Sequence, residues 1–382
     1  MNQSINRERL AETFTTLCEI SSPSRKEGAV AQHLKKCFAE LSADEIIEDN
    51  SAAQTGSECG NLIVRFNGNN KAEGVFFSCH MDTVAPAENV QVVRNGDVFT
   101  SAGETVLGGD DKSGIAAIIE LLHTIKENSL PHGPIEIVLT TCEEIGLLGA
   151  KALEHKHIKA PYGYALDSTG IDSVIIGAPA ASKLKIEIHG LAAHAGLNPE
   201  QGINSIQIAS DAINRLKLGR IDEETTANIG IIEAGVATNI VPPLTTVKGE
   251  VRSHDIQKLK TYTMEIEKAF HDAAADYHNP SAADGRKPTV TISTEGEYPA
   301  MKLETDSPVL QRLYKAEKST GKKLQYLVAG GGSDANIING FGLPTAIIAT
   351  GMNKVHTIDE QLDLNDLASL TELLIGIASE QE

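Results

Sequence analysis

The sequence predicts an α/β domain with a mixed, largely parallel sheet, into which a smaller α+β domain with an antiparallel sheet is inserted. Three observations support this prediction: dense apolar runs in the first and last parts of the chain, an intervening stretch in which apolar and polar residues alternate, and amphipathic helical patterns in both. The length of 382 residues is enough for two or three domains of about 150 residues each.

The predicted parallel strands are short runs made mostly of apolar residues. This composition is typical of strands that helices cover on both faces, because neither face then contacts water. Helical patterns lie among them, and in one of these Ile115, Ile118, Leu122 and Ile125 share a face. The predicted strands are Val75–Cys79, Ile135–Thr140, Val174–Ile176 and Thr345–Ile348, and the predicted helices are Lys112–Glu127, Asp306–Thr320 and Asn365–Ala378.

The inserted domain is predicted from a change of pattern near Ser182. Apolar and polar residues alternate there, which indicates antiparallel strands with one face in water, and two long amphipathic stretches could cover the other face. The alternating apolar residues are Leu184, Ile186 and Ile188, then Val247 and Val251, then Val290 and Ile292, and the amphipathic stretches are Ile203–Leu216 and Ile256–Tyr277. We therefore assign residues 1–181 and 295–382 to the α/β domain and residues 182–294 to the insert.

Composition narrows the class of protein. The chain carries 33 basic and 52 acidic side chains, a formal net charge of −19 with neutral histidine. This charge argues against nucleic acid and anionic membrane as partners, since both require clustered Lys and Arg. The five cysteines form no CxxC pair, which predicts reduced thiols. No secretory signal pattern opens the chain and no run of about 20 apolar residues occurs, so we expect a soluble, cytoplasmic protein.

Four hydrophilic segments with metal-binding residue types fall where parallel strands should end. Taken singly, each has an ordinary structural interpretation: a satisfied histidine, a helix N-cap, the acidic first turn of a helix at Leu147–His155, or an Asx turn. Ligands of open α/β sheets bind outside the carboxyl ends of the strands, so the four segments could converge on one crevice. They are SCHMDT (His80, Asp82), GGDDKSG (Asp110, Asp111), TTCEEIG (Glu143, Glu144) and YALDSTG (Asp167).

Convergence would produce a metal centre. Histidine with carboxylates and without cysteine suits hydrolytic zinc, cobalt or manganese, and a shared carboxylate lets two ions lie about 3.5–4 Å apart. A second histidine, His356 in GMNKVHTIDEQ, follows a predicted strand and completes the ligand set. Several carboxylates in one cleft would resist folding without compensating cations. We therefore predict a dinuclear site.

The motifs also occur in a recognisable order: HxD, GGDDKSG, CEEIG and ALDSTG, then GLAAHAG within the insert, then GGGSDAN and VHTIDE. In this order they resemble the M20 metallopeptidase family, most closely its peptidase T (aminotripeptidase)-like branch, over nearly the whole chain. The resemblance implies a zinc-peptidase-like catalytic domain and an inserted lid domain through which a homodimer could form.

The resemblance implies metal ligands residue by residue. His80 and Asp167 would bind one ion, Glu144 and His356 the other, and Asp110 would bridge them. Two divalent ions are implied, zinc first and cobalt or manganese as alternatives. The family usually has a cis peptide bond after the residue that matches Asp110.

Further roles follow from the same resemblance. Asp82 would accept a hydrogen bond from His80 and fix its tautomer, and Glu143 would be the general base. His194 would stabilise the tetrahedral oxyanion, with a hydrogen-bonded histidine at a strand end as the alternative. Asn239 and Arg252 would bind the carboxylate end of the substrate, with an ordinary surface ion pair as the alternative for Arg252.

The implied activity is hydrolysis of the N-terminal peptide bond of short peptides by a metal-activated water. An M20 amidohydrolase acting on N-acyl amino acids or related amides would use the same metal core, so the core does not separate the two. A noncatalytic metal- or peptide-binding module would need the ligands but not Glu143. A phosphate loop is disfavoured because GGDDKSG lacks the GxxxxGK[ST] spacing, and a serine hydrolase because no GxSxG is found.

Overall fold

The computed structural model describes residues 5–379. Over that range the chain divides into two compact units. The first comprises the chain up to Gly177, Lys302–Ala329, and the chain from Ser333 onward, and the second comprises Ala178–Met301 and Gly330–Gly332. The second unit therefore interrupts the sequence of the first. Within residues 5–379, no helix is both long enough and apolar enough to cross a membrane.

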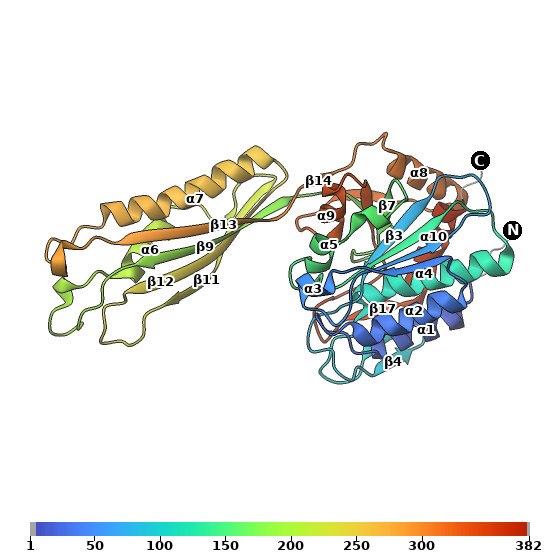
Figure 1. The fold of residues 1–382 in the computed structure, drawn as a ribbon, viewed down its shortest axis with the longest axis horizontal. Helices are drawn as coiled ribbons and strands as arrows, with labels where there is room; N and C mark the ends of the chain where they lie inside the picture. The colour runs from blue at the N-terminus through green and yellow to red at the C-terminus, as the bar shows by residue number, and fades with distance from the viewer. Residues whose placement is uncertain (1–4, 380–382) are drawn as a thin grey trace. The chain divides into compact units, whose positions relative to one another are not determined.

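A mixed sheet forms the centre of the first unit (Figure 1). In spatial order its strands are β1 (Glu45–Glu48), β2 (Leu62–Phe66), β6 (Ile135–Thr140), β3 (Val75–His80), β7 (Gly163–Ala165), β16 (Thr345–Ile348), β8 (Ser173–Ala178) and β14 (Met301–Lys302), with β15 (Gln325–Val328) beside β8. The run from β6 to β16 is parallel. β2 is antiparallel to β6, and β8 is antiparallel to β16 and parallel to β15. The predicted mixed, largely parallel sheet is confirmed.

Helices cover both faces of this sheet. They are α1 (Arg7–Glu19), α2 (Gly28–Glu40), α3 (Ala52–Thr55), α4 (Gly109–Asn128), α5 (Leu148–Ala152), α8 (Pro308–Thr320), α9 (Asp334–Gly340) and α10 (Leu364–Ala378), with a 3-10 turn at His155–His157. A small antiparallel sheet of β4 (Val92–Asn95), β5 (Val98–Ser101) and β17 (Gln361–Asp363) lies in the same unit.

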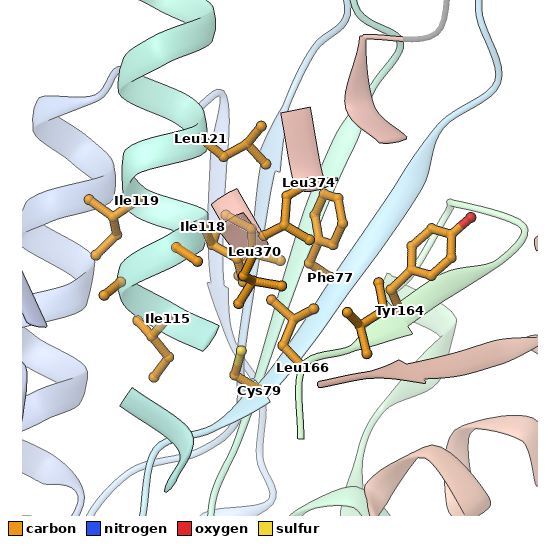
Figure 2. Close-up of a cluster of buried hydrophobic side chains, with 14 of the residues drawn as sticks. Phe77, Cys79, Ile115, Ile118, Ile119, Leu121, Tyr164, Leu166, Leu370 and Leu374 are labelled. Atoms are coloured by element: carbon orange, nitrogen blue, oxygen red, sulfur yellow. The ribbon is translucent and has the colours of Figure 1, made fainter. Parts of the chain in front are cut away.

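Strand β3 shows why the predicted strands are apolar throughout. Phe77 and Cys79 pack on one face with α4 and α10 (Figure 2), whereas Phe76 packs on the other face with Ile338 of α9. All of β3 is buried. A strand between two helical layers has no wet face, so it needs apolar side chains at consecutive positions rather than at alternate ones.

Helix α4 positions one segment of the site. Gly108 precedes it with φ +75°, in the left-handed region that glycine adopts without strain. Asp110 and Asp111 have non-helical dihedral angles and are joined by a cis peptide bond, as the family resemblance implied. Regular helix therefore begins near Lys112, where the apolar periodicity predicted it.

The second unit is an antiparallel sheet with helices on one face (Figure 1). Leu184, Ile186 and Ile188 are buried beneath the helices, while Lys183 and Lys185 are exposed on the other face. The strands lie where the alternation of apolar and polar residues predicted them, and the helices lie within the predicted amphipathic stretches. The strands, in spatial order, are β10 (Gly219–Arg220), β11 (Thr225–Ala234), β12 (Leu244–Ser253), β9 (Ala180–His189) and β13 (Thr289–Tyr298), and the helices are α6 (Ser205–Asn214) and α7 (Ile256–Asp276), with 3-10 turns at Pro199–Gln201 and Ala283–Gly285.

Candidate metal centre

The predicted ligand segments lie at one edge of the main sheet. Because β3, β6, β7 and β16 are parallel, their carboxyl ends share that edge. His80 is the last residue of β3, and Asp167 lies two residues beyond β7. Glu143 and Glu144 follow β6 in a turn that ends before α5 begins at Leu148, so their interpretation as the acidic first turn of a helix is wrong.

Four of the predicted ligands meet directly. Nε2 of His80 lies 3.0 Å from Oδ1 of Asp110. Nε2 of His356 lies 3.2 Å from Oδ2 of Asp110 and 3.0 Å from Oε1 of Glu144. The ligand atoms of His80, Asp110 and Glu144 are all within 4.8 Å of one another. Asp110 therefore contacts both histidines through different carboxylate oxygens, the arrangement expected of a shared carboxylate.

Asp167 and Glu143 belong to the same electrostatic environment. Burial and the negative charge of Asp110 raise the pKa of Asp167 to about 7. Burial and the charge of Asp167 raise the pKa of Glu143 well above its ordinary value. Both residues are partly exposed, and each is close enough to the other charged groups of the site for their charges to act on its pKa.

Asp82 is fully buried and holds the turn that carries both glutamates. Its Oδ1 accepts a hydrogen bond from the backbone N–H of Glu143 at 2.9 Å, and its Oδ2 accepts from that of Glu144 at 3.3 Å. The hydroxyl of Ser24 also donates to Oδ2, at 2.6 Å. Towards His80, the nearest oxygen to Nδ1 is the main-chain carbonyl of Asp82 at 3.0 Å, and Oδ1 lies at 3.5 Å. The carboxylate thus positions the glutamate turn more directly than it orients the imidazole.

Sequence reasoning missed two other buried carboxylates that hold ligand segments. Glu27 accepts hydrogen bonds from the backbone N–H of Cys142 at 2.9 Å and from the hydroxyl of Ser57 at 2.5 Å. Glu360 accepts from the backbone N–H groups of Gly108 and Asp110 at 2.8 and 3.0 Å. Glu27 lies in no quoted motif, and Glu360 ends the VHTIDE motif without any pattern that reveals its role, because each acts on a loop far away in sequence.

Asp334, in the GGGSDAN segment, is a further buried carboxylate beside the site. It accepts a hydrogen bond from Thr140 at the end of β6. Its Oδ1 has no hydrogen-bond partner among the residues that the structure describes. Burial raises its pKa to about 6. A buried carboxylate oxygen without a hydrogen-bond partner costs free energy. A polar or cationic partner at Oδ1 of Asp334 would therefore be favourable.

Interactions with the carboxylates raise the pKa values of both histidines. Hydrogen bonds with Asp110 and Glu144 raise the pKa of His356 to about 10. Burial alone would lower the pKa of His80, but its interactions with Asp110 and Asp82 raise it well above the ordinary value. Burial likewise opposes ionisation of Asp110, yet its two histidine partners hold the pKa of this carboxyl below its usual range. The clustered negative charge therefore favours the protonated form of both imidazoles.

The donor set suits divalent cations. Two imidazole nitrogens and several carboxylate oxygens form a ligand set appropriate to zinc, cobalt or manganese. A cation would take over the charge compensation that protonated histidines supply, and it would lower the cost of burying several carboxylates together.

Metal binding is expected to become tighter as pH rises from about 6 to 9. His80 and His356 must lose protons before their ring nitrogens can bind metal, and their raised pKa values keep these protons bound at neutral pH. Asp167, with a pKa raised to about 7, also loses its proton in this window. Each released proton should tighten binding about tenfold per pH unit below the pKa of its group.

Calorimetric titration of the metal-free protein with Zn²⁺, in buffers of different ionisation enthalpy, counts the released protons. Release of at least one proton per chain at pH 7 is expected. An affinity that is constant across the window would contradict the assigned ligands.

The three residues predicted to contact the substrate, His194, Asn239 and Arg252, all lie in the second unit. His194 and Asn239 are exposed on two adjacent loops, which are joined by a hydrogen bond from the N–H of Ala195 to the carbonyl oxygen of Asn239 at 2.9 Å. Arg252, on β12, forms an ion pair with Glu250 at 2.9 Å. The ion pair predicted as the ordinary alternative for Arg252 is therefore present.

This combination of fold and site defines a metal-dependent hydrolase of the α/β class with an inserted antiparallel domain. The model of peptidase family M20/M25/M40 matches residues 76–380. The chain belongs to that family, and the resemblance inferred from its motifs is confirmed.

Relatives place the chain in the peptidase T-like branch. It is 41% identical over 378 residues to the uncharacterized protein YqjE of Bacillus subtilis (strain 168), covering 98% of this chain and 99% of that protein. The crystal structure of aminopeptidase PepT from Bacillus cereus ATCC 10987 is similar with a TM-score of 0.90 and 37% identity, over 98% of each chain. A tripeptidase from Staphylococcus aureus subsp. aureus mu50 is similar with a TM-score of 0.92 and 35% identity, also over 98% of each chain.

Proposed function

We propose that this metallopeptidase removes the N-terminal residue from short peptides. The observation that carries the proposal is the meeting of His80, Asp110, Glu144 and His356 beside the turn that holds Glu143. Similarity over nearly the whole chain to an aminopeptidase and a tripeptidase supports the choice of substrate class.

The site would hold two divalent ions, for which zinc is the first candidate and cobalt or manganese are the alternatives. His80 and Asp167 would bind one, Glu144 and His356 the other, and Asp110 would bind both. When bound, such ions polarise the scissile carbonyl and lower the pKa of a water molecule. Asp82 and Glu27 support this assignment, because they fix the backbone of the turn that carries Glu144.

Glu143 would move the proton. Its carboxylate would take a proton from the water whose oxygen attacks the carbonyl carbon, and it would deliver that proton to the nitrogen of the leaving amine as the C–N bond breaks. The water oxygen thereby becomes part of the new carboxylate. Burial and the charge of Asp167 raise the pKa of Glu143, which suits a carboxylate that must hold a proton between these two events.

The second unit would bind substrate and mediate dimerisation. Residues 1–181 and 295–382 would form the catalytic domain, and residues 182–294 the lid. In that unit His194 would donate to the tetrahedral oxyanion, and Asn239 and Arg252 would bind the carboxylate end of the peptide. The exposure of His194 and Asn239 supports their availability to a substrate or a second subunit. We place the enzyme in the cytoplasm, where its free cysteines would remain reduced, and we assign it neither nucleic acid nor membrane as a partner.

A substrate screen tests the proposal. The metal-loaded protein is incubated with dialanine, trialanine and N-acetyl-trialanine, and the products are identified by mass spectrometry. Release of free alanine from the amino end of trialanine is expected, with little cleavage of the blocked peptide. Cleavage of only the blocked peptide would indicate an amidohydrolase, and binding without cleavage would indicate a noncatalytic module. Glu143→Gln serves as the inactive control.

A further inference from the structure

Glu360 is a buried carboxylate that lies between two segments of the metal centre. Its side chain is 1% exposed. Oε2 accepts a hydrogen bond from the N–H of Gly108 at 2.8 Å, and Oε1 accepts one from the N–H of Asp110 at 3.0 Å. One side chain thus uses both oxygens to hold the two ends of a three-residue turn.

The turn needs such an acceptor because its backbone is not helical. Gly108 has a left-handed conformation, and Asp110 has φ −82° and ψ 105°. Their N–H groups are buried at the start of α4, where no preceding helical turn offers a carbonyl oxygen. A carboxylate is the strongest acceptor among the protein side chains, and two N–H donors to one carboxylate fix both its position and that of the turn.

The same glutamate is close in sequence to His356. The N–H of Glu360 donates to the carbonyl oxygen of Thr357 at 3.1 Å, which closes the short loop that carries the histidine. His356 itself is half exposed, with 49% of its side chain accessible, and it therefore has little packing of its own. Its imidazole contacts Asp110 and Glu144. Glu360 consequently connects the backbone of Asp110 to the loop of the least buried ligand.

We propose that Glu360 is a positioning residue that sets the separation of Asp110 and His356, and so controls the affinity of one of the two ions, the one between Asp110, Glu144 and His356. The inference rests on the proposed function, since it takes these residues as metal ligands. The ion between His80 and Asp167 shares Asp110 with the second ion but does not use the loop of His356. Because His80 ends a buried strand, this ion should depend less on Glu360.

Glu360→Gln tests this role. Glutamine keeps the size of the side chain but offers one acceptor oxygen and places an NH₂ group against the second N–H donor. Zn²⁺ titration of the metal-free full-length protein should show two binding events in the parent. In the variant, one should weaken about 10- to 100-fold and the other, which shares only Asp110 with it, should weaken by a clearly smaller factor.

A matched control separates positioning from general stabilisation. Glu136 on β6 is also buried, and its Oε2 accepts hydrogen bonds from the backbone N–H groups of Lys159 and Ala160 at 2.8 and 2.9 Å, while Oε1 accepts from Arg65. It lies at the end of the strand opposite to the site. Glu136→Gln should lower the melting temperature of the metal-free protein yet leave both Zn²⁺ affinities unchanged.

The affected ion is identified by a double-mutant cycle. In a His356→Ala background, which already lacks a ligand of the second ion, Glu360→Gln should reduce the affinity for the remaining ion by no more than this smaller factor. The absorption spectrum of bound Co²⁺ gives an independent readout, because it should change for one equivalent of metal and not for the other.

If Glu360→Gln folds poorly, a second and milder variant can test the same role. A Cβ at position 109 would lie 3.2 Å from Oε1 of Glu360, so Gly109→Ala should displace the carboxylate slightly and weaken the same ion by a smaller factor. Parent-like affinity for both ions in Glu360→Gln, or equal weakening of both, would overturn the inference. A parent protein that binds no metal would instead contradict the proposed function.

Discussion

Replacement of Glu143 by glutamine is expected to lower the rate of peptide hydrolysis about 10²- to 10⁴-fold, the usual contribution of a general base, while both ions stay bound. Glutamine has nearly the same shape as glutamate but cannot accept and release a proton near neutral pH. The backbone N–H of Glu143 donates to Asp82, so the turn should keep its conformation in the variant.

The adjacent Glu144→Gln variant is the matched control for Glu143→Gln. Oε1 of Glu144 lies 3.0 Å from Nε2 of His356, so this change should weaken metal binding as well as catalysis. Metal content measured by elemental analysis, together with kcat and KM for trialanine, separates the two cases. A Glu143→Gln protein with full metal content and the parent kcat would exclude the proposed base.

Removal of metal is expected to reduce hydrolysis by on the order of 10³-fold or more, because the ions supply several kcal/mol of charge stabilisation. Dialysis against a chelator should abolish activity in the parent, and added Zn²⁺, Co²⁺ or Mn²⁺ should restore it. Asp110→Asn should remain inactive at the same metal concentration, because Asp110 contacts both histidines and loses its charge in this variant.

Comparison of two single-ligand variants sharpens the test of Asp110. His80→Ala and His356→Ala should each lose one equivalent of metal, whereas Asp110→Asn should weaken both equivalents. Loss of only one equivalent in Asp110→Asn would show that this carboxylate is not shared. Activity that survives complete removal of metal, verified by elemental analysis, would contradict the proposed mechanism as a whole.

The sequence predicted the sheet well because burial leaves a clear mark on composition. Strand β3 is apolar throughout because helices cover both of its faces, and the strands of the second unit alternate because one face is wet. Strand direction was less accessible. Val174–Ile176, predicted as a parallel strand, lies in β8, which is antiparallel to β16. The apolar composition of a buried strand does not show whether its neighbour runs parallel or antiparallel to it.

The sequence also predicted that the hydrophilic segments would meet, and His80, Asp110 and Glu144 do lie close together. The position of GGDDKSG was predicted less well, because Asp110 lies at the start of α4 and not at the end of a strand of the main sheet.

Apart from Asp82, the sequence did not identify the residues that hold those segments. Glu27 looks like an ordinary acidic residue in a polar stretch, and Glu360 ends the VHTIDE motif beside the more conspicuous His356. Only the folded chain shows that their carboxylates are buried against backbone N–H groups. Hydrogen bonds between distant segments leave no periodic pattern in a sequence.

The position of Glu360 and His356 late in the chain has a consequence for biosynthesis. A polypeptide emerging from the ribosome would present His80, Asp110 and Glu144 long before the second unit, Ala178–Met301, has been made. The partner imidazole and the glutamate that holds its loop arrive only afterwards. If these residues bind metal as proposed, the ion between Asp110, Glu144 and His356 can bind only after the second unit and the segment that carries His356 have been made.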